Sequence, residues 1–303
     1  MIWRKRSEEI QNTKTSALRI SEAIKRKKII IKNLVSYSLL SLIGITMITP
    51  FLWMVSTSLK GPTEVFMFHG SWWRSLVPKS IIWSNYIEAL KVVPFIRFYL
   101  NSIFVGLCVT FGQVFTSSLS AYAFARLRFP GRDKIFFSYI ATIMIPGAVI
   151  MIPVFVLLRL MGWIDTYKAL IIPPVFIAYG TFMLRQFFMT LPAELEDAAK
   201  IDGCSLFGIY WRIILPLSKP ALATLTIFTF MGNWASFMWP LLVINRTELK
   251  TLPIGLEYFQ SQYTTDWTLL MAGAVMAMIP VVLVFIFNQR FFIEGIKLTG
   301  MKA

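Results

Sequence analysis

Six long stretches without a charged residue alternate with polar segments along this chain of 303 residues. They cover residues 33–59, 98–125, 135–158, 169–184, 220–245 and 267–289. An apolar helix needs about 20 residues to cross a bilayer, and only the fourth stretch, with 16 neutral residues, falls short. There Arg185 is followed by Gln186 and two phenylalanines, so the helix can continue while the guanidinium extends to the headgroups. The pattern predicts an all-α, polytopic membrane protein with six transmembrane helices.

The same stretches divide the chain into segments. We predict a basic N-terminal segment at 1–32, a first transmembrane helix at 33–59, an external loop at 60–97, a core of five helices at 98–290 and a tail at 291–303. An even number of spans places both termini on one side. The tails and loops of that side hold 21 of the 30 Lys and Arg residues, and the other loops hold 9. The positive-inside rule therefore predicts that both termini and the charged loop 191–220 are cytoplasmic.

The formal charge of +15 does not indicate a nucleic-acid partner. Its densest cluster, Lys25 to Lys28, stands just ahead of the first apolar stretch, where attraction to anionic lipid and the fixing of topology explain it. The apolar stretch follows some thirty polar residues and is too long for the apolar region of a signal peptide. We interpret it as a retained anchor.

Candidate chemistry is sparse. Ion-coupled carriers keep charged groups at membrane depth, and none of the six stretches contains one. The phosphate-binding pattern G-x-x-x-x-G-K-[ST] is absent from the sequence. We therefore expect no catalytic residue, metal or cofactor in this chain, and any driving ATPase would be a separate polypeptide. The single histidine, His69, lacks companions for a metal set and is interpreted as an interfacial residue.

Residue choice within the stretches predicts close packing and bends. Small or polar residues recur every four positions on the second stretch, which lets a neighbouring helix approach closely: Gln113, Ser117, Ala121 and Ala125. Prolines remove backbone donors and predict bends or breaks at Pro50, Pro146, Pro153, Pro173, Pro174, Pro240 and Pro280.

The loop 191–220 predicts two short helices with a glycine corner. Pro192 suits a helix start with Thr190 or Leu191 near the cap, and acidic residues in the first turns favour the helix dipole. Gly203 is the expected left-handed stop, and Ser205 can cap a second helix before Pro216 bends the chain. In that helix apolar residues repeat at helical spacing: Leu206, Ile209, Tyr210, Ile213 and Ile214. Physical reasoning leaves two interpretations equally open, docking on another protein or lying on lipid.

The spacing within this loop resembles a known signature. It is similar to the pattern E-A-A-x3-G-x9-I-x-L-P of binding-protein-dependent ABC importer permeases, with Asp197 in place of the glutamate. Further similarity to the carbohydrate subgroup, of maltose and glycerol-3-phosphate type, lies at 201–203, 215–220, 232–234 and 289–296. The resemblance implies the type I permease fold, a coupling helix pair in the loop, and a multi-pass protein of a bacterial or archaeal cytoplasmic (inner) membrane.

The resemblance also implies partners and residues. The partners are a homologous second permease subunit, two ATP-binding cassette subunits that hold ATP and Mg, and an extracytoplasmic solute-binding protein. The cargo is a sugar or oligosaccharide; glycerol-3-phosphate-like or alginate-like acidic cargo is the alternative within this class. The residues implied in coupling to the ATPase are Glu194, Glu196, Asp197, Ala198, Ala199, Asp202, Gly203, Ile213, Leu215 and Pro216.

Three further assignments stay open at the level of sequence. The solute pathway candidates are Gln113, Asn233, Trp234, Ser236 and Trp239, and the alternative is helix packing, because isolated polar residues in spans more often bond neighbouring helices. In maltose-type relatives one external loop reaches into the binding protein, and an ordinary connector is the alternative. The corresponding residues of this chain are Leu252, Pro253, Ile254, Gly255 and Leu256. The tail 298–303 resembles one that lies against the ATPase dimer, where fraying is the default. Neutral spans alone would also allow an autonomous channel or uniporter, and the sequence leaves a homodimeric or heterodimeric permease open.

Overall fold

The computed structural model describes residues 2–67, 74–260 and 265–300, and the side chains of residues 30–67, 75–260 and 265–287. Within these ranges the chain is helical and forms no strand; its sole β-bridge joins Gln260 and Thr265. The all-α prediction is confirmed. The chain forms two compact units, one of Met1–Ser56 with Phe68–Val77, the other of Thr57–Met67 with Pro78–Ala303.

The first unit consists mainly of helix α1 (Ile2–Ser58), whose part Ile30–Ser58 is apolar enough to cross a membrane. Pro50 lies inside α1 without interrupting it. The predicted basic segment and first span thus form one continuous helix. The short helix η2 (Arg74–Leu76) also belongs to this unit.

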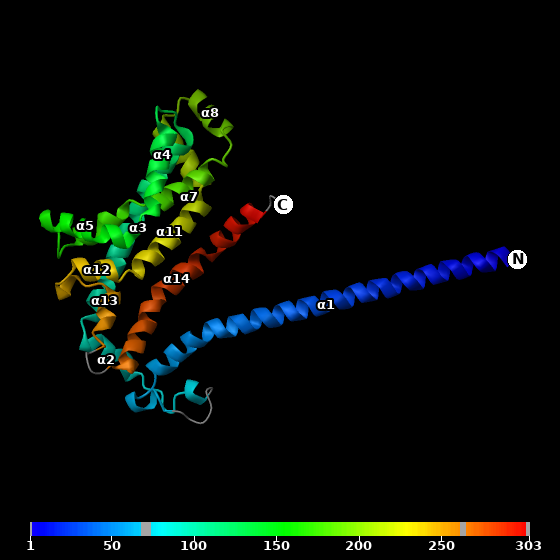
Figure 1. Ribbon diagram of the computed structural model, residues 1–303, viewed down its shortest axis with the longest axis horizontal. Coiled ribbons are helices and arrows are strands. Elements are labelled where there is room, and N and C mark those ends of the chain that lie inside the picture. The colour runs from blue at the N-terminus through cyan, green and yellow to red at the C-terminus, as the bar shows by residue number, and fades with distance from the viewer. Residues whose placement is uncertain (1, 68–73, 261–264, 301–303) are drawn as a thin grey trace. The chain divides into compact units, whose positions relative to one another are not determined.

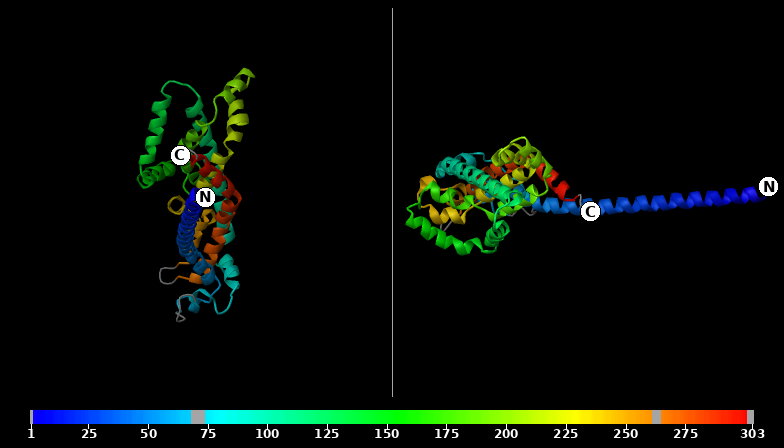
Figure 2. Two further views of the ribbon diagram at one scale, coloured as in Figure 1. Left: turned by 90° about the vertical axis from the view of Figure 1, so that its right-hand side faces the viewer. Right: turned by 90° about the horizontal axis from the view of Figure 1, so that it is seen from above.

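The second unit is built around α3 (Phe95–Arg126), as Figures 1 and 2 show. Helices α7 (Ala178–Phe188) and α11 (Lys219–Trp234) pack on α3, α14 (Trp267–Gly300) packs on α11, and α2 (Ser84–Val92) packs on α14. The remaining elements connect these helices: η1 (Pro62–Glu64), α4 (Arg132–Ala141), η3 (Thr142–Met144), α5 (Gly147–Leu160), α6 (Tyr167–Ile171), η4 (Pro173–Val175), α8 (Glu194–Ile201), α9 (Leu206–Ile209), η5 (Tyr210–Ile214), α10 (Leu215–Leu217), α12 (Met238–Val243), η6 (Thr247–Leu249) and α13 (Leu252–Glu257).

Three helices in the described residues are long and apolar enough to span a membrane, and up to six spans result if each of three bent pairs counts as one. The continuous ones are Ile30–Ser58, Phe95–Arg126 and Trp267–Phe287. The bent pairs join Arg132–Met144 to Gly147–Leu160 at 100°, Tyr167–Val175 to Ala178–Phe188 at 40°, and Leu206–Leu217 to Lys219–Trp234 at 80°. Pro146 and the pair Pro173-Pro174 stand at or beside two breaks, whereas Pro153 and Pro280 lie inside helices.

The predicted close approach on α3 is present against α7. Gln113, Ser117 and Ala121 are buried. A Cβ at Gly180 of α7 would stand 2.5 Å from the Ser117 hydroxyl oxygen, so only glycine permits this spacing.

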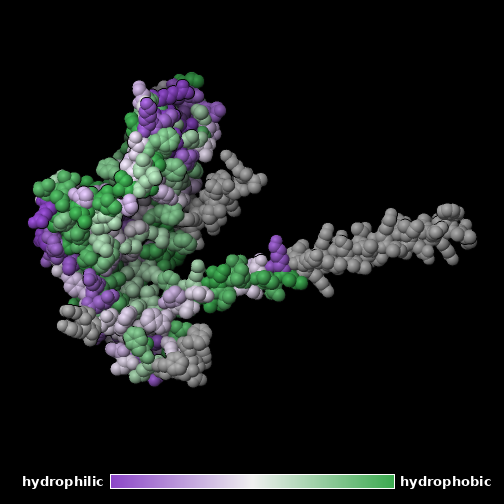
Figure 3. All heavy atoms as spheres, in the orientation of Figure 1, coloured by the Kyte–Doolittle hydropathy of each residue, from purple (hydrophilic) through white to green (hydrophobic). Residues whose placement is uncertain are grey.

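Surface polarity is uneven along the second unit. Figure 3 shows hydrophilic residues gathered at the end that carries α8, above a surface on which apolar residues prevail. Large apolar side chains of α4 and α5 are exposed, among them Phe137 at 68% and Ile152 at 69%. Such an apolar surface is what a lipid-facing helix presents.

Candidate functional site

The loop 191–220 folds as the two helical segments predicted for it, at the end of the second unit opposite α2 and α13 (Figure 1). The first segment is α8, and the second segment consists of α9, η5 and α10. Helix α8 ends at Ile201, and Gly203 follows its C-cap Asp202 with a left-handed φ of +79°. The Cys204 N–H donates to the Ala199 carbonyl at 2.9 Å, and the Gly203 N–H donates to Lys200 at 3.0 Å. This bond pair is the Schellman ending. The predicted glycine corner is confirmed.

The cap of the second segment is also confirmed, whereas the start of the first differs from the prediction. Ser205 Oγ accepts from the Gly208 N–H at 3.1 Å, the bond of an N-cap. Helix α8 begins at Glu194 behind Ala193, without a side-chain cap. The Thr190 hydroxyl instead donates to the Phe187 carbonyl at 2.7 Å, so it closes α7.

A π-helical turn lies within the second segment. Over η5 the Leu215 N–H donates to the Tyr210 carbonyl, five residues back. Pro216 has no N–H to continue the ladder, and the chain bends by 80° between Leu217 and Lys219. The bend expected beside Pro216 is therefore present, and it directs the chain into α11.

The inner face of the second segment is fastened to α3. Ile209, Tyr210 and Ile214 are at most 1% exposed, whereas Leu206 of the same predicted stripe is 51% exposed. The Tyr210 and Ser118 hydroxyl oxygens lie 2.7 Å apart, and the Tyr122 hydroxyl donates to the Leu206 carbonyl at 3.2 Å. The bond between Tyr210 and Ser118 is buried, so its loss would leave a polar group unpaired away from water.

An ion pair fastens α8 itself to the end of α3. Arg126 Nε lies 2.9 Å from Glu196 Oε1, and the two side chains are only 11% and 7% exposed. The two atoms are close enough for an ion pair but do not align as a hydrogen bond. Arg126 Nη2 also donates to the carbonyls of Phe188 and Leu191, each at 2.6 Å. The Arg126 guanidinium therefore holds both α8 and the turn between α7 and α8.

Sequence reasoning missed this contact and grouped Glu196 with residues facing a partner. The available signal was the spacing of Glu196 and Ala199, which lie three apart and share one helix face. Both are 6% exposed. Arg126, the last residue of α3, was the cation to pair with that face.

The outer face of α8 is open to a partner. Of the predicted coupling residues, those exposed are Glu194, Asp197, Ala198, Asp202, Gly203 and Pro216, while Ile213 and Leu215 are partly buried. Asp197 Oδ1 lies 3.0 Å from Lys200 Nζ in a pair that is 68% and 51% exposed, so the pair itself contributes little stability. Ile201 is 88% exposed. The exposed face is thus apolar in part and charged in part, and sequence reasoning had omitted Ile201.

Four of the five pathway candidates come together around two hollows. Gln113 donates to the Pro174 carbonyl at 2.7 Å and accepts from Asn233 Nδ2 at 3.2 Å. Gln113 and Asn233 both line a hollow of about 410 Å³. Asn233, Ser236 and Trp239 line a second one, of about 110 Å³.

Trp234 lies apart from these candidates. It is 6% exposed, and its indole N–H donates to the Ala277 carbonyl of α14 at 3.0 Å. Packing is therefore its role in the structure. Trp239, although it lines a hollow, also donates to the Ala169 carbonyl at 3.0 Å.

The residues considered for contact with a binding protein lie largely inside the chain. In α13, Leu252 and Ile254 are each 1% exposed, and Gly255 faces the ring of Phe98, which leaves no room for a Cβ. The Leu252 N–H donates to Ser102 Oγ at 2.7 Å. Pro253 and Leu256 are partly buried. The segment therefore packs on α3, and the surface that a partner could touch is carried by its exposed neighbours.

Those neighbours include Tyr258, which is 44% exposed. Lys250 Nζ donates to its hydroxyl at 2.9 Å, and this bond lowers the pKa of Tyr258 from its ordinary value. The preceding turn η6 is held by Arg97 and Asn101, which donate to the Glu248 carbonyl at 2.9 Å each. His69 and the side chains of the tail 298–303 lie outside the described residues.

Comparison with known proteins places this geometry in a family. The family described as binding-protein-dependent transport system inner membrane component matches residues 113–297. The arabinooligosaccharides transport system permease protein AraQ of Halalkalibacterium halodurans is 38% identical over 67% of this chain and 73% of its own length. The sn-glycerol-3-phosphate transport system permease protein UgpE of Pectobacterium atrosepticum is 36% identical over 73% of this chain and 82% of its own.

A solved structure agrees with these relatives. The crystal structure of a bacterial ABC transporter involved in the import of the acidic polysaccharide alginate contains a chain of the same fold. It is 25% identical to this chain with a TM-score of 0.78, and the match covers 86% of this chain and 96% of that one. The resemblance drawn from the spacing at Asp197 is confirmed. The chain belongs to the binding-protein-dependent transport system inner membrane components, and it is a permease of the sugar and oligosaccharide ABC importer family.

Proposed function

We propose that this chain, with a homologous second permease subunit, moves a sugar or oligosaccharide into the cytoplasm by alternating access, driven by two separate ATP-binding cassette subunits. ATP and Mg would be held by those subunits, and an extracytoplasmic binding protein would deliver the cargo. The observation that carries the proposal is the two-sided build of α8. Its outer face is exposed, and its inner face is locked to α3 through Arg126 and Glu196.

This build is suited to transmitting motion. An ATPase that holds the face with Asp197, Ala198 and Ile201 would move α8, and the buried pair would carry the displacement to α3. The second segment would carry it to α11, because Tyr210 is bonded to Ser118 of α3 and the chain runs on through the bend. Coupling of this kind needs an element with two arrangements that both partners bias. We place both termini and the loop 191–220 on the cytoplasmic side.

The hollow beside Gln113 favours a neutral cargo. Its described lining consists of amide, hydroxyl, aromatic and apolar side chains, with no charged residue: Gln113, Ile177, Tyr179, Phe228, Thr229, Gly232 and Asn233. Sugar hydroxyls can exchange hydrogen bonds with amides. A phosphate or uronate would lose its hydration there without gaining a cation, so acidic cargo is the second candidate, favoured only by the relatives UgpE and the alginate importer.

The decisive experiment is reconstitution. The chain, its partner permease, the ATPase and the binding protein are placed in liposomes, and uptake of a neutral oligosaccharide is measured with and without ATP. We expect uptake only with ATP and the binding protein, together with copurification of the ATPase. Solute flux from this chain reconstituted alone would instead establish the autonomous channel.

A further inference from the structure

Two adjoining hollows lie along the connection between α3 and α4, and the larger one separates that connection from α8. The larger, of about 790 Å³, is lined by residues 125–129 and by part of α8, including Lys200. The smaller, of about 370 Å³, is lined by residues of the connection and the start of α4. Arg128, Phe129 and Arg132 line both, so the two hollows form one basic surface across three elements.

This surface holds more positive charge than its own acids can neutralise. Five cations line it, Arg126, Arg128, Arg132, Lys134 and Lys200, against the three carboxylates Asp133, Glu196 and Asp197. Every carboxylate already has a cation, since Arg126 lies 2.9 Å from Glu196, Arg132 lies 3.0 Å from Asp133, and Lys200 lies 3.0 Å from Asp197.

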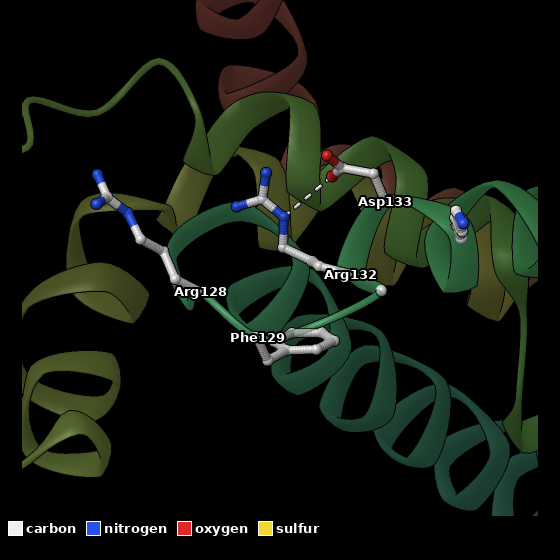
Figure 4. A pocket seen from close by; sticks show the side chains of 6 residues that line it. Arg128, Phe129, Arg132 and Asp133 are labelled. Atoms are coloured by element: carbon white, nitrogen blue, oxygen red, sulfur yellow. Dashed lines mark hydrogen bonds and ion pairs between the residues drawn. The ribbon is translucent and has the colours of Figure 1, made fainter.

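Two cations are left over. Arg128 and Lys134 form no ion pair with any described residue. Figure 4 shows the guanidinium groups of Arg128 and Arg132 rising on the same side of the connection, with Phe129 lying across from them. The arrangement leaves an excess of two positive charges facing a hollow large enough for a phosphate group.

An apolar surface continues from this basic one. Phe129 is 36% exposed, and Ile135 and Phe137 on α4 are 52% and 68% exposed. Helix α4 begins the apolar pair that ends with α5. A ligand with an anionic head and an apolar tail satisfies both surfaces, whereas a free phosphate uses only the first. Basic pockets at the cytoplasmic edge of a membrane protein bind anionic headgroups in this way.

We propose that the basic hollow between α8 and the α3–α4 connection binds the phosphate of an anionic phospholipid, whose acyl chain lies along α4. The phosphate lies between Arg128, Lys134 and Arg132, and Lys200 closes the side formed by α8. A bound lipid therefore joins the coupling loop to the first cytoplasmic connection. This inference concerns the lipid and does not depend on the cargo.

The test uses the full-length chain in detergent and native mass spectrometry with added phosphatidylglycerol, with zwitterionic phosphatidylcholine as the reference lipid. The variant Arg128→Gln/Lys134→Gln removes the two cations that have no ion pair. The matched control Lys79→Gln/Lys91→Gln removes two exposed cations elsewhere in the second unit. We expect phosphatidylglycerol to bind the first variant about 30-fold more weakly than the natural chain, from two basic groups near an anionic lipid, and the control to bind as the natural chain does.

Equal binding by both double variants overturns the proposal, as does displacement of the lipid by inorganic phosphate, which would identify a site for free anions. Loss of ATPase binding in the first variant with unchanged lipid binding would assign the surface to an acidic protein partner instead. A second measurement, made on the natural chain, keeps the proposal testable if the Arg128→Gln/Lys134→Gln variant misfolds. A photoactivatable phosphatidylglycerol should cross-link the natural chain within residues 126–137, and cross-links confined to other segments refute the site.

Discussion

Removing Glu196 tests whether the buried ion pair holds the loop 191–220 in place. Glu196→Ala would leave the Arg126 guanidinium, only 11% exposed, without its carboxylate. Breaking a buried pair by removing one partner costs roughly 3–5 kcal/mol. Arg126 still donates to two carbonyls, which disperses its charge, so we expect about 3 kcal/mol, the lower end of that range.

The reverse change should be more severe. Arg126→Ala strands the Glu196 carboxylate at 7% exposure and also removes the donor from the carbonyls of Phe188 and Leu191. We expect about 5 kcal/mol, the upper end of the range for a broken buried pair. A double variant lacking both side chains should lose less than the sum of the two single losses, because neither charge is then left unpaired.

The neighbouring acid provides the matched control. Asp197 lies in an exposed pair with Lys200, and such pairs contribute about 0–1 kcal/mol. Thermal unfolding of the purified chain should therefore change little in Asp197→Ala and clearly in Glu196→Ala. ATPase copurification should nevertheless fall clearly in Asp197→Ala, because this substitution removes a charge from the outer face of α8. Equal destabilisation by the two substitutions would refute the assignment of one acid inward and the other outward.

Three further predictions concern other parts of the second unit. Gly203→Val should abolish ATP-driven uptake while membrane insertion persists, and Gly203→Asn should retain uptake. The space around Gly203 is open, and only its φ of +79° excludes a branched residue. Equal uptake by both variants would contradict this. Burial opposes ionisation of Asp165, but the backbone N–H groups of Arg246 and Asn245 outweigh it and lower the pKa of Asp165 from its ordinary value. The stability that the carboxylate adds is fully present above the ordinary pKa and is lost as the pH falls through the lowered one. The fluorescence of Trp163, followed as the pH is lowered, should therefore show an acid transition in the natural chain and none in Asp165→Asn. Gln113→Leu should raise the KM for a neutral oligosaccharide, whereas Trp234→Phe should lower thermal stability by about 1 kcal/mol and leave KM unchanged; the opposite pattern would exchange their roles.

Features set by neighbouring residues were predictable from the sequence. Helical class followed from the length of the apolar stretches, because a backbone in lipid must satisfy its own hydrogen bonds. The corner at Gly203 and the cap at Ser205 followed from single residues, because a left-handed φ and a capping hydroxyl act over three or four positions. The signature beginning at Asp197 then indicated the family.

The direction in which each side chain faces required the folded chain. Glu196 and Asp197 are adjacent and chemically alike, yet one lies against Arg126 and the other lies in solvent. Adjacent helical positions differ by about 100° around the axis, so only the place of α3 decides which acid is inward. In the same way the apolar segment after Thr251 is buried against α3, where Ser102, 150 residues earlier in the chain, accepts the Leu252 N–H.

The sequence by itself therefore determined the membrane class, the helical class, the glycine corner and the family, because each is encoded in residues close together in the chain. Tertiary structure alone decided that Arg126 is the anchor of α8, that Trp234 packs while Gln113 and Asn233 line a hollow, and that Arg128 and Lys134 remain without carboxylates. Those assignments depend on helices that meet after long separations in sequence, where periodicity along one helix carries no information about its neighbours.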